Sequence, residues 1–245
     1  RVLFRSTLLV SVASQRRPNP RGLPSPEPSE KLVIPSPQRP LLIASGNPHK
    51  YDEISRELSL DEQTLVRPVD LEAKLGSEAP NPVEDGESLL ENALIKASAF
   101  SRWSGLPALA DDTGLMVDAL DGAPGIYAAR FAGENATFQD NVARLLKDLG
   151  DLPEEQRSAE FRCVLALCNA DQVILSVEEK CPGHISQEAR GAGGFGYDPV
   201  FIPRGETLTF AEMTPAQKNA ISHRGLAVRR FAQLFKEFTT TGESR

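Results

Sequence analysis

Two apolar segments in the middle of the chain restrict its fold more than any other feature, because only four residues separate them. Residues 161–168 read FRCVLALC, residues 173–179 read VILSVEE, and Asn-Ala-Asp-Gln joins them. Such a short, turn-rich connection predicts an antiparallel hairpin. Earlier in the chain, strand-like runs at 41–45, 64–69 and 108–110 alternate with helical patterns at 48–58 and 88–103. Alternation that gives way to a hairpin predicts an α/β fold with a mixed sheet.

Helical segments are marked by their apolar faces and capping residues. Residues 88–103 present one apolar face, and Asn92 and Lys96 lie one turn apart on another face. Thr137 is expected to cap a helix over 137–149. Thr214-Pro215-Ala216-Gln217 combines an N-cap, a proline and a glutamine at the positions that start a helix, and Ser222 is expected to cap the last helix.

The charge of the chain is unevenly distributed. The 245 residues carry a net charge of −7, yet residues 1–40 carry +5, so that residues 41–245 carry −12. An acidic body is a poor surface for nucleic acid, and no apolar run is long enough to span a membrane. We therefore expect no nucleic-acid or membrane partner, and we expect a phosphate compound to bind in a local site with a divalent cation.

Residues 1–40 differ from the rest in composition. They contain eight of the 19 prolines, are rich in arginine, and begin with Arg rather than Met. The proline-rich run at 16–40 is expected to sustain neither helix nor strand. Residues 1–40 are interpreted as a disordered extension, an organelle-targeting segment or an overlong gene model. We expect residues 41–240 to form a single domain in the cytoplasm, with organelle targeting by residues 1–40 as the alternative.

Residues 191–199, GAGGFGYDP, match the pattern G-x-G-x-x-G of dinucleotide-binding turns. That turn requires a helix directly after the glycines, so that the helix N-terminus faces the pyrophosphate. Here Tyr197-Asp198-Pro199 and then Pro203 follow, and no helix of useful length fits. The stretch is then either a bare flexible turn or a ligand loop. We interpret the glycines as clearance for a flat ligand and Phe195 as a ring that stacks on it.

The segment 41–50, LLIASGNPHK, has the layout of a phosphate loop without a Walker motif. A strand ends at Ser45-Gly46-Asn47 and a helix begins near Pro48. Backbone N–H groups at such a junction can face an anion, and Lys50 on the first turn can reach the same phosphate. The alternative is an ordinary glycine turn followed by a solvent-exposed lysine.

Asp111 and Asp112 directly follow the strand-like run at 108–110. Neighbouring side chains on a strand face opposite ways, so only one of the two is expected to enter a given site. Glu84 and Glu91 are further carboxylates for a metal site, because Mg²⁺ is typically held by one or two carboxylates and by substrate phosphates. A solvated acidic turn is the alternative for the aspartate pair.

The segment 218–225, KNAISHRG, places Lys218, His223 and Arg224 between two helix-start signals. Cations near helix N-termini oppose the helix dipole, which suggests that they serve a ligand. Arg and His can donate to the O6 and N7 acceptors of an oxopurine. Ordinary surface charge is the alternative.

Together these segments resemble one family closely, the inosine triphosphate pyrophosphatases, which act on dITP and XTP. The motifs that carry the resemblance are SGNPHK, ENALIKA, LADDTGLMVDALDGAPGIYAARFAG, GGFGYDPVF and TFAEMTPAQKNAISHRG, and they cover nearly all of residues 41–235. The resemblance implies an elongated mixed sheet with flanking helices, in two lobes around a nucleotide cleft, and a homodimer. It also implies Mg²⁺-dependent hydrolysis of ITP, dITP and XTP to the monophosphate and pyrophosphate.

The resemblance also assigns roles to residues. Asp112 would be the catalytic residue and a metal ligand, and Glu84 a second metal ligand, although its surroundings match only loosely. Thr113 falls where many relatives have serine. The triphosphate would bind to Ser45, Gly46, Asn47, Pro48, His49 and Lys50, and the nucleoside to Phe195, Gly196, Tyr197, Asp198, Lys218, His223 and Arg224.

Two rival functions remain at this point. One is a septum-related nucleotide pyrophosphatase that acts on modified pyrimidines, against which the segments SHRG and GGFGYDP argue. The other is a nucleotide-binding protein without catalytic activity, against which the pair of Asp112 and Glu84 argues.

Overall fold

The computed structural model describes residues 40–58 and 65–242, with side chains up to residue 238. Apart from Pro40, the predicted extension at residues 1–40 lies outside the described residues. The prediction of a single domain over residues 41–240 stays a prediction. None of the helices in the described part of the chain is long and apolar enough to cross a membrane.

A seven-stranded mixed sheet forms the centre of the fold, in the order β2-β1-β3-β5-β6-β7 with β4 paired to β3. The pairs β1–β2 and β1–β3 are parallel, and all other pairs are antiparallel. The predicted α/β fold with a mixed sheet is therefore confirmed. The strands are β1 (Leu41–Ile43), β2 (Leu65–Val66), β3 (Ala108–Val117), β4 (Pro124–Gly125), β5 (Ser158–Asn169), β6 (Gln172–Ile185) and β7 (Phe201–Pro203).

Helices flank the sheet, and most begin at the residues that the sequence indicates. The side chains of Asn47, Ser88, Thr137 and Thr214 accept hydrogen bonds from the backbone of the first helical turn. Ser222 caps the last helix by accepting from the Gly225 N–H at 3.1 Å. The helices are α1 (Pro48–Glu57), α2 (Pro68–Leu75), α3 (Leu89–Ser104), α4 (Phe138–Leu149), α5 (Pro215–Ile221) and α6 (His223–Gly242), with short 3₁₀ turns at Asp118–Leu120, Ala128–Arg130 and Glu154–Gln156.

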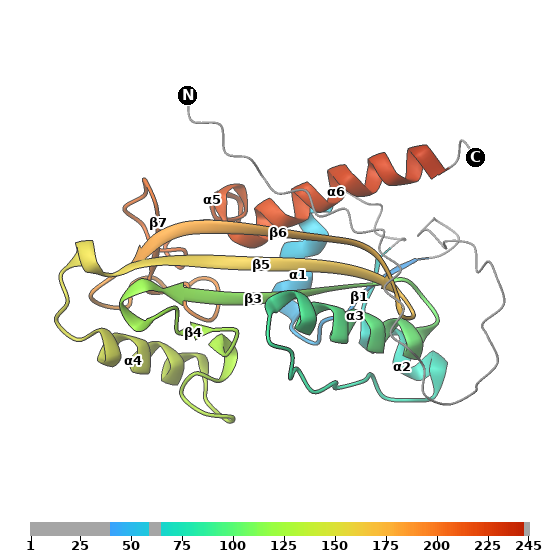
Figure 1. Ribbon diagram of the computed structural model, residues 1–245, viewed down its shortest axis with the longest axis horizontal. Helices are drawn as coiled ribbons and strands as arrows, with labels where there is room; N and C mark the ends of the chain where they lie inside the picture. The colour runs from blue at the N-terminus through green and yellow to red at the C-terminus, as the bar shows by residue number, and fades with distance from the viewer. Residues whose placement is uncertain (1–39, 59–64, 243–245) are drawn as a thin grey trace, which may run out of the picture. The chain divides into compact units, whose positions relative to one another are not determined.

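The two faces of the sheet pack against different helices, because side chains alternate along each strand. Leu109 of β3 belongs to a core with Ile54 of α1 and Phe231 of α6. The neighbouring residues Ala108 and Ala110 belong to a core with Ala97 and Phe100 of α3. Figure 1 shows α6 along one face and α3 along the other. This alternation decides what each polar residue further along β3 can reach.

The predicted end of β3 is wrong. The run was expected to stop at residue 110, but β3 continues to Val117 and carries both aspartates within it. Its antiparallel pairing with β5 continues through this polar stretch, with Asp111 opposite Leu165 and Asp112 opposite Val164. Polar residues usually end a buried strand, but here charged partners from the flanking helices satisfy them.

The strand predicted over 64–69 is also mostly wrong. Of its described residues only Leu65 and Val66 are strand, and α2 begins at Pro68. Proline fits the first turn of a helix, and the Asp70 carboxylate accepts from the Arg67 backbone N–H at 3.1 Å. These residues start a helix, although the apolar residues before them favoured the prediction of a strand.

Candidate active site

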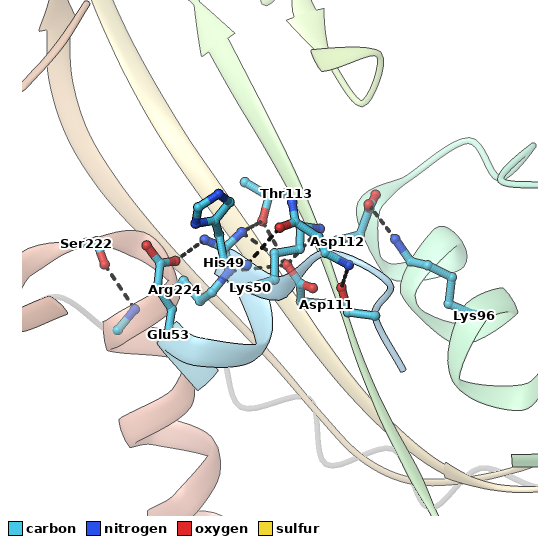
Figure 2. A network of polar contacts seen from close by, with 12 residues as sticks. His49, Lys50, Glu53, Lys96, Asp111, Asp112, Thr113, Ser222 and Arg224 are labelled. Carbon is cyan, nitrogen blue, oxygen red and sulfur yellow. Dashed lines mark hydrogen bonds and ion pairs between the residues drawn. The ribbon is translucent and has the colours of Figure 1, made fainter. Parts of the chain in front are cut away.

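Adjacent aspartates on β3 face opposite sides of the sheet, as the sequence predicts. Asp111 shares the side of Leu109 and meets α1 and α6, whereas Asp112 shares the side of Ala110 and meets α3. Figure 2 shows Lys96 near Asp112, and Lys50 and Arg224 near Asp111. The strand β3 therefore separates two polar clusters. One contains a lysine between two carboxylates, and the other contains a carboxylate between two cations.

On the α3 side, one lysine joins two carboxylates. Lys96 Nζ lies 2.9 Å from Asp112 Oδ1 and 2.7 Å from Glu84 Oε2. Asn92, one turn earlier on α3, donates its side-chain amide to Asp112 Oδ2 at 3.4 Å and accepts from the Gly86 N–H at 2.9 Å. Asn92 thus ties the loop that carries Glu84 to the helix. The two predicted metal ligands converge on a single cation.

Burial raises the pKa of Asp112, and the Lys96 ammonium opposes that rise without cancelling it. A carboxylate with a raised pKa accepts a proton more readily, which suits a general base. The other carboxylate considered for the metal, Glu91, lies elsewhere: its Oε2 accepts from the Glu87 N–H at 2.6 Å at the start of α3. The geometry thus favours Glu84 over Glu91 as the partner of Asp112.

On the opposite side, Asp111 is surrounded by cations. Its Oδ2 lies 3.1 Å from Lys50 Nζ and 3.1 Å from Arg224 Nη2. Burial alone would raise the pKa of Asp111, but Lys50 and Arg224 outweigh it and hold the pKa well below its ordinary value. Thr113 points the same way and accepts from Arg224 Nη2 at 3.0 Å. Asp111 is thus a charged structural anchor that positions Lys50 and Arg224.

The predicted phosphate loop lines a cavity of about 670 Å³. Ser45, Gly46, Asn47, Pro48 and Lys50 all contribute to its wall, together with Glu84 and Lys96. The loop is shaped by its own side chains, since Ser45 Oγ accepts from the Asn47 N–H at 3.2 Å and Asn47 Oδ1 accepts from the His49 N–H at 2.9 Å. Pockets of this volume suit small ligands. One cavity thus brings together the phosphate loop and the Glu84–Lys96 pair.

The Phe195 ring contacts another aromatic ring and two cations. The ring of His49 stacks on it with centroids 5.4 Å apart and planes 15° apart. Lys218 Nζ lies 5.0 Å from the centre of the Phe195 ring, and the Arg224 guanidinium carbon lies 5.4 Å from it. His49 is exposed and Phe195 half-buried. This arrangement is an aromatic platform beside the phosphate loop, with cationic donors next to it.

The glycine loop is closed by Asp198. One Asp198 oxygen, Oδ2, accepts from the Phe195 N–H at 2.8 Å and from Lys218 Nζ at 2.7 Å. Gly194 has φ +70°, and a Cβ there would overlap the Asp198 carboxylate, while a Cβ at Gly191 would overlap the Ala211 backbone. The interpretation of these two glycines as clearance for a purine is therefore wrong. They make room for the loop's own carboxylate and a neighbouring chain segment.

Gly194→Ala and Gly196→Ala form a matched pair that tests this role. Both glycines have positive φ, but only Gly194 faces the Asp198 carboxylate, because nothing lies within 4 Å of a Cβ at Gly196. We expect Gly196→Ala to lower the free energy of unfolding by about 1 kcal/mol through left-handed strain. Gly194→Ala should lower it by about 2–4 kcal/mol, because the overlap adds to that strain. Urea unfolding measures both, and equal losses would contradict the clearance role.

Two residues predicted for the nucleoside site are deeply buried. The Tyr197 side chain is 4% exposed, and its hydroxyl donates to the Ala128 carbonyl at 2.9 Å. His223 stacks on Phe161 with ring centroids 4.4 Å apart. Burial lowers the pKa of His223 well below its ordinary value, and Arg224 and Lys218 lower it further, so the imidazole is neutral. Among the described residues, its Nδ1 has no hydrogen-bond partner.

Glu53 of α1 connects the remaining cations of the site. Its two carboxylate oxygens lie 2.7 Å from Lys218 Nζ and 2.5 Å from Arg224 Nη1. Burial alone would raise the pKa of Glu53, but Arg224 and Lys218 outweigh it and lower the pKa. Lys218 therefore lies between Glu53 and Asp198, and Arg224 between Glu53 and Asp111. Carboxylates of the chain thus hold both cations in place.

Known proteins resemble this chain over most of its described length. The family model of the Ham1 family matches residues 41–234. This chain belongs to the Ham1 family. A dITP/XTP pyrophosphatase from Photorhabdus laumondii is 44% identical over 191 residues, covering 77% of this chain and 94% of the relative. One from Geobacter sulfurreducens is 45% identical over 188 residues, covering 77% of this chain and 92% of the relative.

Solved structures of the Ham1 family share this fold. A HAM1 protein from Coxiella burnetii matches with a TM-score of 0.70 and 36% identity, covering 81% of this chain and 99% of that chain. The Ham1 protein of Staphylococcus aureus matches with a TM-score of 0.70 and 32% identity, covering the same shares. The predicted family is thereby confirmed, while the roles of single residues stay predictions.

Three residues of this Ham1 family member were not predicted for the site. Lys96 and Asn92 adjoin Asp112, and Glu53 holds Lys218 and Arg224. For the first two a signal exists in the sequence, because polar residues spaced one turn apart interrupt a largely apolar helix. Glu53 gives no such signal, because an acidic residue after a lysine is ordinary on a helix surface.

Proposed function

We propose that this protein hydrolyses the triphosphates of deaminated purines, namely ITP, dITP and XTP, to the monophosphate and pyrophosphate with Mg²⁺. One observation carries the proposal: residues 45–48 and Lys50 of the SGNPHK loop line one cavity together with Glu84 and Lys96, and Lys96 also pairs with Asp112. That arrangement suits a triphosphate and a water molecule. The relatives from Photorhabdus laumondii and Geobacter sulfurreducens are dITP/XTP pyrophosphatases, which supports the substrate class.

Asp112 and Glu84 are the residues that would hold Mg²⁺. The described residues contain no group of three or more acidic, histidine or cysteine side chains suited to a metal. Two carboxylates that already converge on an ammonium nonetheless fit Mg²⁺, which takes few protein ligands and completes its shell with phosphates and water. When bound, Mg²⁺ would neutralise phosphate charge and acidify water.

The chain's own groups have separate tasks in this reaction. Asp112 orients the attacking water towards the α-phosphorus and accepts its proton, for which its raised pKa is suited. Lys96 has three N–H donors; Asp112 and Glu84 take two, and the third can bind a phosphate oxygen. Lys50 and the backbone N–H of Gly46, which the internal hydrogen bonds of the loop do not use, stabilise charge on the phosphates.

The platform at Phe195 would select the base. A purine stacked there lies beside Lys218 and Arg224, each of which has donors not taken by the carboxylates that hold it. Hypoxanthine and xanthine present an acceptor at position 6, where adenine presents an N–H₂ donor. Adenine would leave these cationic donors unpaired in a buried site, which gives strong discrimination.

Pyrophosphate release from a panel of nucleotides tests the proposal. We expect ITP, dITP and XTP to be hydrolysed with a kcat/KM about a hundredfold or more above that of ATP, and we expect EDTA to abolish release until Mg²⁺ is restored. GTP and dUTP complete the panel. Preference for pyrimidines would favour the septum-related activity instead. No release from any nucleotide would favour a binding protein.

The homodimer and the cytoplasmic location expected from the sequence also stay predictions. Sedimentation of the full chain would test the first, and localisation of the tagged full chain in cells the second.

A further inference from the structure

The cavity at the phosphate loop continues beyond the residues assigned to the nucleotide. Besides the loop, its wall includes Arg67 and Pro68 at the start of α2 and the segment Ala79–Pro82. The described residues that line it do not include Phe195, Lys218 or Arg224. If the base stacks on Phe195 and the phosphates follow the loop, the cavity extends towards the far end of the triphosphate. Its distal wall therefore faces the phosphates that leave as pyrophosphate.

Arg67 is the cation at this distal wall. Its Nε and Nη2 donate to the two oxygens of Asp70 at 3.0 and 2.9 Å, and its guanidinium lies 5.7 Å from the centre of the Tyr51 ring. These contacts orient the guanidinium and leave the Nη1 N–H groups for another acceptor. Guanidinium groups match phosphate oxygens in geometry as well as charge.

The other two cations among the described residues of the cavity wall are already paired with carboxylates. Lys50 pairs with Asp111, and Lys96 pairs with both Glu84 and Asp112. The Asp70 carboxylate that holds Arg67 is exposed and does not line the cavity. Because Lys50 and Lys96 are already paired with carboxylates, and one Mg²⁺ would offset only part of the charge of pyrophosphate, Arg67 at the distal wall is placed to bind the remainder.

We propose that Arg67 binds the terminal phosphates of the substrate and, after cleavage, the pyrophosphate product. This inference rests on the proposed function and adds a leaving-group contact outside the SGNPHK loop. Arg67 contributes to binding and takes no part in proton transfer. Because Arg67 contacts only the terminal phosphates, its loss should weaken the binding of pyrophosphate but not the binding of the monophosphate product.

Calorimetric titration of the full chain with pyrophosphate and Mg²⁺, and separately with IMP, tests this inference. We expect Arg67→Ala to raise the Kd of pyrophosphate about tenfold, as for one exposed charge-assisted contact, and to leave the Kd of IMP unchanged. The pyrophosphate Kd of Arg67→Lys should lie between those of the wild type and Arg67→Ala, because lysine keeps the positive charge but lacks the planar donor geometry of the guanidinium. Arg56→Ala, an exposed arginine in the last turn of α1 outside the cavity wall, is the matched control and should change neither.

An unchanged pyrophosphate Kd in Arg67→Ala would overturn the inference. An equal rise in the Kd of IMP would also overturn it, because it would indicate a general disturbance of the site. The titration needs no turnover. A wild-type chain that hydrolyses no nucleotide would therefore contradict the proposed function, while the pyrophosphate titration would still decide the role of Arg67.

Discussion

Asp112→Asn is expected to lower kcat for ITP by about a thousandfold, because the amide accepts no proton from water and binds Mg²⁺ poorly. The fold should remain intact. The pKa of Asp112 is raised in the folded chain, which means that folding favours its neutral form. A neutral asparagine therefore removes no net stabilisation. Steady-state release of pyrophosphate and thermal unfolding measure the two quantities.

The neighbouring substitution Asp111→Asn is the matched control. The pKa of Asp111 is lowered, so its charged form stabilises the fold above its unfolded pKa, and this contribution is lost as pH falls through the folded pKa. Asn at this position leaves Lys50 and Arg224 short of a buried partner and should lower stability at neutral pH by about 3 kcal/mol. Substantial turnover in Asp112→Asn, or a stability loss equal to that of Asp111→Asn, would remove Asp112 from its assigned role.

Lys50→Ala is expected to raise the KM for ITP by about ten- to a hundredfold, because it removes a charge-assisted contact to the phosphates. Lys50 stands on the first turn of α1, lines the cavity and has a side chain that is 20% exposed. A contact made equally in the ground and transition states changes KM more than kcat. We therefore expect kcat to fall much less than in Asp112→Asn.

Lys147→Ala is the control for Lys50→Ala, because Lys147 is an exposed lysine in the last turn of α4. It should leave both constants unchanged. Unchanged KM and kcat in Lys50→Ala would show that Lys50 pairs with Asp111 and does nothing for the substrate.

Much of the fold follows from local signals in the sequence. The hairpin of β5 and β6 was predictable because four turn-forming residues separate two apolar runs, and the helix starts at Thr137 and Thr214 were predictable because capping is a local interaction. The length of β3 was not. Its polar residues are satisfied by Lys50, Lys96 and Arg224, which are distant in sequence, and no local pattern shows that.

The contacts among the predicted site residues could not be read from the sequence, and their roles stay predictions. The alternation of side chains along a strand already separates Asp111 from Asp112, and the structure adds that the first anchors cations while the second shares Lys96 with Glu84. The glycine loop was misinterpreted for a related reason. Its tight packing against Asp198 and Ala211 depends on tertiary contacts, whereas its composition alone suggested an open ligand turn.

The products formed from ITP test the central claim most directly. Wild-type protein would be incubated with ITP and Mg²⁺, and the nucleotides and phosphates separated by anion-exchange chromatography. Attack on the α-phosphorus by a water that Asp112 orients predicts IMP and pyrophosphate in equal amounts. Formation of IDP and inorganic phosphate, or no product at all, would contradict the account.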